Sequence, residues 1–393
     1  MKRILLIGLL FTCVYAFSQP NPGMKELREQ NIGWAPMMAP KGNAIGKSLT
    51  VQGRTYTPHQ IALIDTFTTW IKKSYTPIGA LPQPERLALP DSKENKVYMP
   101  YGTGVSMWMW DPCYDASGKK IIKAEPASAA QITILTNFIP GISPAEWFNT
   151  QSQFFFTMYY DPIGTALNDD DQRSMSPYIE KIKNQTGNYL IYFTGKRINI
   201  IMIPGNKLPL VQLSKEEVLN QGTEAVKRAF ANKKMTQYQY DEYLATIEFL
   251  REKHKNSLQE KAFINHEQAG IYSFSKSNDL FEKQPSNRYM FPVYKIEPDI
   301  YVKARNDQPC WISISFPYAD EKSFTSEKEV YNAMLHNFNY EYVYNYFFDP
   351  EKVKDKKYTP RNPELLRSVS AKYPKIKEDE EITILTDYVL HNE

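Results

Sequence analysis

The chain contains 393 residues, of which 42% are hydrophobic and 23% are charged, the usage of an ordinary globular protein. This composition excludes a chain that is disordered along its whole length, and the length suffices for two or three domains. The formal net charge is +3, and Lys2 and Arg3 contribute two of these charges. Because the rest of the chain is nearly neutral, we expect no nucleic acid as a partner.

The first 18 residues have the pattern of a cleavable secretory signal peptide. Lys2 and Arg3 precede a short apolar run, and the small residues Ala16 and Ser18 suit a cleavage site after Ser18. The run is shorter than the roughly 20 residues of a membrane-spanning helix, and no later segment is apolar enough to span a bilayer. We therefore expect an exported protein, periplasmic or extracellular, with no transmembrane segment in its mature chain.

The three cysteines bear on processing and on stability. Lipid attachment at Cys13 is less favoured than plain cleavage, because Phe11 and Thr12 fit a lipoprotein signal poorly. After cleavage, Cys113 and Cys310 remain, and two cysteines in an oxidising compartment predict one disulfide. Such a bridge would contribute about 5 kcal/mol in the chain-entropy model. The alternative is two buried thiols that never meet.

Composition and periodicity divide the rest of the chain into four parts. Residues 19–55 are rich in Pro, Gly and Asn and predict an extended arm, laid on the domain or flexible. An α+β domain over 56–210 and a helical hairpin region over 211–284 follow. Residues 285–393 form a C-terminal α+β region, and whether it packs with the first domain is left open.

The α+β domain is predicted to begin with a helix at Thr57-Pro58, where apolar residues recur at three- and four-residue spacing. Residues 81–90 contain three prolines and are predicted to form a loop. Alternating or dense apolar runs predict strands over 105–110, 119–123, 131–139 and 154–160.

The sequence Thr194-Gly195-Lys196-Arg197 is the clearest β-hairpin signal in the chain. The flanking strands, 189–193 and 198–203, are apolar on both faces. We therefore expect this pair to be covered on both sides and to lie centrally in a sheet.

Two capping boxes predict a helical hairpin over residues 214 to about 262. Ser214 with Glu217, and Thr236 with Gln239, place a hydroxyl at the cap and a reciprocal acceptor three residues later. Each cap is followed by an apolar stripe at helical spacing. The outer faces of both helices are charged, which is typical of a solvated surface.

Strand signals return over 293–303 and 311–316, and a last strand is predicted over 382–389. Between them, Ser326 and Glu329 predict a capped helix that continues through Tyr342. Helices and strands alternate, but they do not form regularly repeated strand–helix units. The sequence therefore predicts an α+β class, with mixed or antiparallel sheet elements and an inserted helical hairpin.

No pattern in the chain identifies a metal, a cofactor or a catalytic group. The Gly-rich stretch 42–48 is one residue too short for a phosphate-binding loop. The five histidines are scattered and lack metal-ligand spacing: His59, His254, His266, His336 and His391. No Gly-x-Ser-x-Gly elbow is present, and neither mature cysteine has the setting of an activated thiolate. We therefore expect no cofactor and no metal.

The most suggestive surface feature is the sequence Met107-Trp108-Met109-Trp110-Asp111. On a strand, Trp108 and Trp110 point to the same face, where two indoles beside Asp111 could stack on a sugar or hold an extended peptide. The alternative places the indoles on the core side of the sheet.

Two function classes follow from the sequence. The leading one is a non-enzymatic binding protein of the cell envelope, with a glycan or an envelope protein as partner and Trp108, Trp110 and Asp111 as binding residues. The alternative is a hydrolase of polysaccharide or peptide, whose carboxylates converge only in the fold. Whether the protein is an enzyme stays open at this point.

Overall fold

The computed structural model describes most of the chain between Leu27 and Ile384. The predicted signal peptide and Cys13 lie outside the described residues. Within the described part, no helix combines the length and the apolar character that crossing a bilayer requires. The described residues are 27–38, 44–45, 48–51, 54–90, 98–114, 120–126, 130–145, 148–158, 170–266, 273–283, 290–373, 375 and 383–384.

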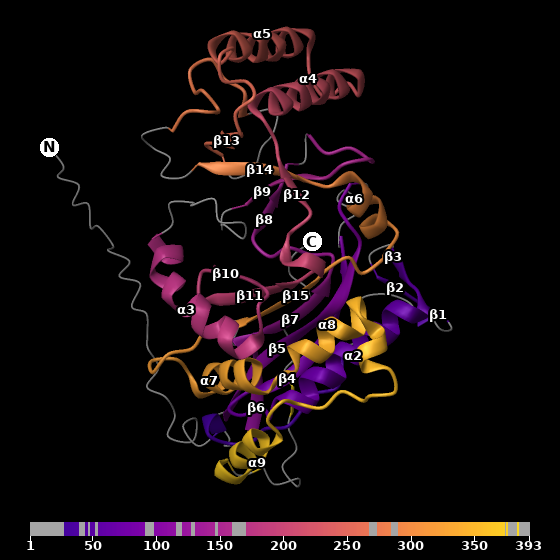
Figure 1. Cartoon of the computed structure of the whole chain (residues 1–393), viewed down its shortest axis with the longest axis vertical. Coiled ribbons are helices and arrows are strands. Elements are labelled where there is room, and N and C mark those ends of the chain that lie inside the picture. The colour runs from indigo at the N-terminus through magenta and orange to yellow at the C-terminus, as the bar shows by residue number, and fades with distance from the viewer. Residues whose placement is uncertain are drawn as a thin grey trace, which may run out of the picture.

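The protein has an α+β fold, as the sequence predicts, and it is built on one large sheet (Figure 1). The strands follow the order β10-β11-β15-β7-β5-β6-β16, and β4 pairs with β5. All described pairs in this sheet are antiparallel except β6 with β16. Its strands are β4 (Leu81–Leu89), β5 (Gly102–Tyr114), β6 (Lys120–Pro126), β7 (Ile132–Thr136), β10 (Leu190–Thr194), β11 (Arg197–Met202), β15 (Ile312–Pro317) and β16 (Thr383–Ile384).

One face of the large sheet is apolar and is covered by helices. Met107 and Met109 of β5 are fully buried on this face, together with Ile134 of β7 and Ile314 of β15. Figure 1 shows the covering helices on one side of the sheet. They are α2 (Pro58–Ser74), α3 (Asp170–Thr186), α7 (Thr325–Asn332) and α8 (Tyr340–Phe348), with α9 (Pro363–Lys372) beyond them.

A smaller sheet lies between the large sheet and the helical hairpin. Side-chain alternation gives it two buried faces: Tyr294 and Phe156 pack with Tyr192 and Ile201 of the large sheet, whereas Val293 packs toward the hairpin. Its order is β12-β14-β9-β8, with β13 paired to β14. The strands are β8 (Ile142–Pro144), β9 (Phe155–Met158), β12 (Leu210–Gln212), β13 (Phe263–Ile264) and β14 (Phe291–Ile296).

The helical hairpin consists of α4 (Lys215–Ala231) and α5 (Gln237–Lys253) and stands at one end of the long axis (Figure 1). Both predicted capping boxes are present. Ser214 accepts the amide of Glu217 at 3.1 Å, and Glu217 accepts the Ser214 amide at 2.9 Å. The apolar stripes that follow the caps form the core with β14. The prediction of a helical hairpin is confirmed.

The predicted proline-rich loop over 81–90 is wrong, because most of this segment is strand β4. Pro82 and Pro84 alternate with Gln83 and Glu85, and they direct their backbone toward the edge of β4 that faces away from β5. The pairing with β5 therefore needs no N–H group from either proline. On that edge, the carbonyls of Pro82 and Pro84 accept amides of Ala35 and Met38, at 3.0 and 2.8 Å. The prolines therefore suit a strand whose outer edge is covered by the N-terminal arm.

The β10–β11 hairpin forms as predicted, with Gly195 at a φ of +57° in the turn. Its apolar residues are buried on both faces of the sheet: Phe193 and Ile198 pack under the helices, and Tyr192 and Ile201 under the smaller sheet. The expected central position is wrong for β10, which is an edge strand, because β15 pairs with β11 instead.

The helix predicted from Ser326 through Tyr342 is interrupted, and its predicted cap is wrong: α7 begins at Thr325, where Glu327 accepts the Phe324 amide at 3.0 Å. The helix α7 gives way to a π-helix over Ala333–Asn337, and Phe338 is extended before α8 begins. The side chain of Asn339 caps α8 by accepting the Tyr342 amide at 3.0 Å, which favours a new start there.

The strand predicted over 293–303 is also too long. It ends at Ile296, and the residues after it form α6 (Pro298–Arg305). Pro298 has no N–H for a strand ladder but suits the first turn of a helix. Three further short strands pair near the start of the described chain: β1 (Ala44–Ile45), β2 (Ser48–Val51) and β3 (Arg54–Tyr56). The last predicted strand, 382–389, is described only at β16.

The predicted disulfide between Cys113 and Cys310 is absent, because Cys310 is a free thiol. The Cys310 amide donates to Asn137, whose side chain also donates to the Tyr101 carbonyl beside the first residue of β5. Cys113 lies eleven positions after Gly102 in β5, about 35 Å along an extended strand. The two Cα atoms of a disulfide lie within about 7 Å, so the sheet keeps these cysteines apart.

Candidate functional site

The face of the large sheet opposite the helices is polar over much of its area. Register places polar residues of neighbouring strands directly opposite one another, so that they form lateral rows. The smaller sheet covers the apolar end of this face. We call the remainder the polar face: Gln83, Glu85, Ser106, Trp108, Trp110, Gln131, Thr133, Arg197, Asn199 and Ser315.

Trp108 and Trp110 lie on the polar face and are half-buried, whereas Met107 and Met109 between them are fully buried on the other face. The two indole rings are nearly parallel, with centroids 6.4 Å apart and an interplanar angle of 22°. Trp110 also packs against Ile32 of the arm. The alternative that places both indoles in the helix-covered core is therefore wrong.

The indole N–H groups are held by two side chains of the neighbouring strand β4. Trp110 donates to Gln83 at 2.8 Å, and Trp108 donates to the carboxylate of Glu85. These bonds fix the orientation of both rings before any ligand arrives. Asp111, which sequence reasoning grouped with the indoles, is half-buried at an irregularity in the pairing of β5 with β6.

Amide and hydroxyl groups continue the polar face beyond the indoles. Gln131 donates to the hydroxyl of Ser106 at 2.5 Å, and this hydroxyl lies 3.5 Å from that of Thr133. Gln131 and Thr133 are half-buried. The surface next to Trp108 thus offers planar amides and hydroxyls, which donate and accept hydrogen bonds.

A cation lies at the other end of the rows. The Arg197 guanidinium donates from Nε to the Ser315 hydroxyl at 3.1 Å and from Nη2 to the main-chain carbonyl of Gln131 at 2.8 Å. Burial lowers the pKa of Arg197 to about 10, so the group stays charged at neutral pH. Next to it in the strand, Asn199 is fully buried, and its Oδ1 has no hydrogen-bond partner in the described part of the chain.

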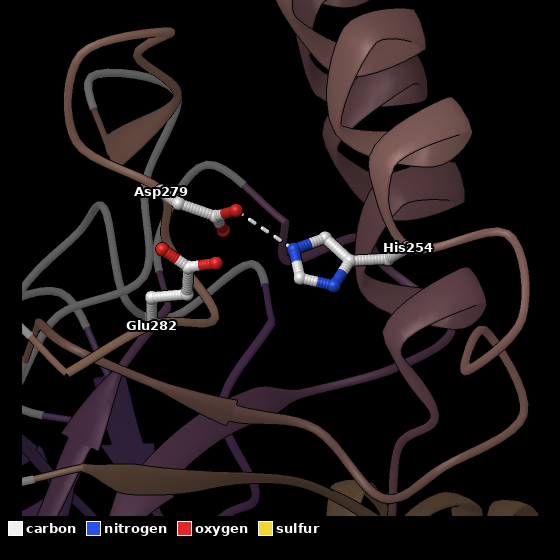
Figure 2. Close-up of side chains that lie close together, drawn as sticks. All are labelled: His254, Asp279 and Glu282. Atoms are coloured by element: carbon white, nitrogen blue, oxygen red, sulfur yellow. Dashed lines mark hydrogen bonds and ion pairs between the residues drawn. The ribbon is translucent and has the colours of Figure 1, made fainter.

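A second cluster of functional side chains lies at the hairpin end. Figure 2 shows His254, Asp279 and Glu282 turned toward one another from the end of α5 and a loop. His254 Nε2 lies 2.7 Å from Asp279 Oδ2. Lys253 Nζ lies 2.8 Å from Asp279 Oδ2 and 2.8 Å from Glu282 Oε1. The ammonium therefore fills the space between the two carboxylates.

This cluster ties the 273–283 loop to the hairpin. The side chains of His254, Asp279 and Glu282 are ordinary ligands for Zn²⁺, but a metal would have to displace the Lys253 ammonium. Burial by itself would raise the pKa of Asp279, yet hydrogen bonds from Lys253, the Phe281 amide and His254 outweigh it and lower the pKa. The geometry is that of a charged network with a structural role.

A cavity of about 810 Å³ opens between α8 and the 350–359 loop, on the side of the covering helices. Its described lining residues include no histidine and no cysteine, and its charged groups are glutamate and lysine side chains.

Among the described residues of β4 and β5, Glu85 and Asp111 are the acids nearest the indoles. Glu85 pairs with Ser106 across the ladder, and Asp111 lies five positions further along β5, about 17 Å in an extended strand. Hydrolysis requires a separation of about 5 to 9.5 Å between the two carboxyl groups.

Comparison of the chain with models of protein families, with curated proteins and with solved structures gave no match. The functional reading therefore depends on the geometry alone. Sequence reasoning found Trp108 and Trp110 through their spacing but missed Gln83, Glu85 and Arg197. The local signal for Gln83 and Glu85 is their alternation with prolines, a pattern that by itself predicts a loop.

Proposed function

We propose that the protein is an exported, non-enzymatic binding protein that holds a glycan on the polar face. The observation that carries this proposal is the pair of half-buried, nearly parallel indoles whose N–H groups are already bonded to Gln83 and Glu85. Export rests on the signal-like first 18 residues.

The chemistry around the indoles favours a sugar as the ligand. Tryptophan rings stack on the apolar faces of sugar rings, and planar polar side chains bond their hydroxyl groups. Gln83, Glu85 and Gln131 lie beside the rings and supply such groups. An extended peptide that adds a strand would need a free edge next to the indoles, but the outer edge of β4 is bonded to the arm at Ala35 and Met38.

Affinity electrophoresis through gels that contain soluble polysaccharides tests the proposal. The purified mature protein should be retarded by at least one polysaccharide of a panel of neutral and acidic polymers. The substitution Trp108→Ala should weaken retention by about thirtyfold in Kd, the loss of a central aromatic contact of about 2 kcal/mol.

Tyr238→Ala is the matched control, because Tyr238 is a 74% exposed aromatic residue on the distant hairpin helix α5. This variant should keep the full retention. The proposal is wrong if no polysaccharide retards the protein, or if Trp108→Ala and Tyr238→Ala migrate as the unsubstituted protein does.

A further inference from the structure

The Arg197 side chain reaches across the sheet toward the indoles. Arg197 belongs to β11, yet its Nη2 atom donates to Gln131 just before β7, which is two strands away. Ladder register makes Met107 the partner of Ile132, so Gln131 lies beside Trp108 on the next strand. Because neighbouring strands are about 4.8 Å apart, the guanidinium stands one strand from the Trp108 side chain.

The hydrogen-bond partners of this guanidinium are neutral. Both of its bonds are to uncharged oxygens, the Ser315 hydroxyl and the Gln131 carbonyl. In the described part of the chain, no carboxylate forms an ion pair with Arg197. Partial burial of a charge without a counter-ion costs free energy, and an arginine fork is suited to bind a carboxylate through two parallel hydrogen bonds.

Charge is therefore distributed unevenly around Trp108. The cation of Arg197 lies toward β7, and the carboxylate of Glu85 lies on the opposite side, in β4. A ligand ring that stacks on Trp108 would meet a positive group at one edge and acceptor groups at the other. A sugar whose carboxylate is attached directly to its ring matches this arrangement, with its hydroxyls toward β4.

We propose that the glycan bound on the polar face is acidic, and that Arg197 binds the carboxylate of a uronic acid residue stacked on Trp108. This inference rests on the proposed glycan-binding function and names its ligand class. The burial that lowers the pKa of Arg197 also strengthens its attraction for an anion, because less water screens the pair.

The test compares acidic polymers with neutral forms of the same backbones. Polygalacturonate, alginate and hyaluronate are each used as such and after chemical reduction of their carboxyl groups, in affinity electrophoresis and titration calorimetry. At least one acidic polymer should bind the unsubstituted protein about tenfold tighter than its reduced form, the value of a hydrogen-bonded charge. Raising the salt concentration should weaken binding of the acidic form only.

Two substitutions assign the effect to Arg197. Arg197→Gln should remove the preference for the acidic form while leaving the weaker binding of the reduced form. Lys196→Gln is the matched control, because it deletes the same charge at the adjacent, exposed position in the hairpin turn and should keep the preference. If Arg197→Gln does not fold, the comparison of acidic and reduced polymers on the unsubstituted protein tests whether the ligand is acidic.

The outcomes separate the two proposals. Retention of reduced polymers as strong as that of the acidic ones, lost in Trp108→Ala, would overturn the acidic ligand and leave glycan binding in place. An acidic preference that survives in Arg197→Gln would overturn the role of Arg197. Absence of binding to every polymer, acidic or reduced, would overturn glycan binding itself.

Discussion

On strand β5, Met107 and Met109 point into the helix-covered core, whereas Trp108 and Trp110 point to the opposite, half-open face. The same strands therefore build two surfaces of different chemistry. On the first, apolar side chains are buried by α2, α3, α7 and α8. On the second, amides, hydroxyls and one guanidinium are bonded in rows, and the smaller sheet covers only the apolar end.

The difference indicates where stability and where function are located. Apolar burial contributes about 25 cal/mol per Å², so the helix-covered face contributes more to the free energy of folding than the polar face does. The polar face contributes less to folding, because its hydrogen bonds largely replace bonds with water. The proposed binding of another molecule at the polar face agrees with a surface that adds little stability yet fixes two indoles in position.

The largest effect that distinguishes the two faces should come from β5 itself. Met107→Ala should lower the free energy of unfolding by about 3 kcal/mol, since Met107 is fully buried and truncation leaves a cavity. Ser106→Ala, one position away on the polar face, should cost less than about 1 kcal/mol, the value of one hydrogen bond. Urea denaturation of both variants measures the difference. Equal losses would mean that the two faces contribute alike to folding.

Sequence reasoning succeeded where the determining contacts are local. The capping pairs Thr57 with Gln60 and Ser214 with Glu217 each lie within one helical turn, so the helix starts were predicted correctly. The β10–β11 hairpin is likewise set by its own turn at Gly195.

Prediction failed where contacts with a segment distant in sequence determine the local structure or the partners of a side chain. Pro82 and Pro84 fit a strand only because Ala35 and Met38 bond the outer edge. The indole partners Gln83 and Glu85 depend on the register of β4 with β5, which no short pattern encodes. Arg197 meets the site only because β15 and β7 bring Gln131 within its reach. The sequence therefore predicts only part of the site. The spacing of Trp108 and Trp110 predicts that the two indoles share a face, whereas the polar groups beside them are placed by the order of the strands.

A second contrast concerns two charged side chains, Asp279 and Arg197, that are shielded from solvent to different degrees. Asp279 at the hairpin end is bonded by Lys253 and His254, whereas Arg197 on the polar face has only neutral partners among the described residues. Asp279→Asn keeps the shape of the side chain but removes its charge, and it should lower the free energy of unfolding by about 2 kcal/mol at pH 7. Glu282→Gln, whose parent side chain is 52% exposed, should cost less than about 1 kcal/mol.

The pH dependence sharpens the same contrast. The pKa of Asp279 is lowered in the folded protein, so its contribution is fully present above the unfolded value of about 3.9 and is lost as the pH falls through the folded value. The unsubstituted protein should lose stability below about pH 4 more steeply than Asp279→Asn. Parallel stability profiles of the two proteins, measured by urea denaturation from pH 7 to pH 3, would contradict the structural role of this network.

The last prediction concerns the end of the large sheet that the smaller sheet covers, on the side opposite the helices. Cys310 packs there, beside the smaller sheet. Burial raises the pKa of the Cys310 thiol to about 11, and nearby Lys303 offsets this only in part. Because the thiolate is the reactive form, iodoacetamide should label Cys310 about a hundredfold more slowly at pH 8 than it labels the unfolded protein. Peptide mass spectrometry of the Cys310 peptide measures both rates. Rapid labelling in the folded protein would show that this end of the face is as open as the indole surface. A Cys113–Cys310 cross-link would contradict the strand order, which holds Cys310 beside the start of β5 and Cys113 near its other end.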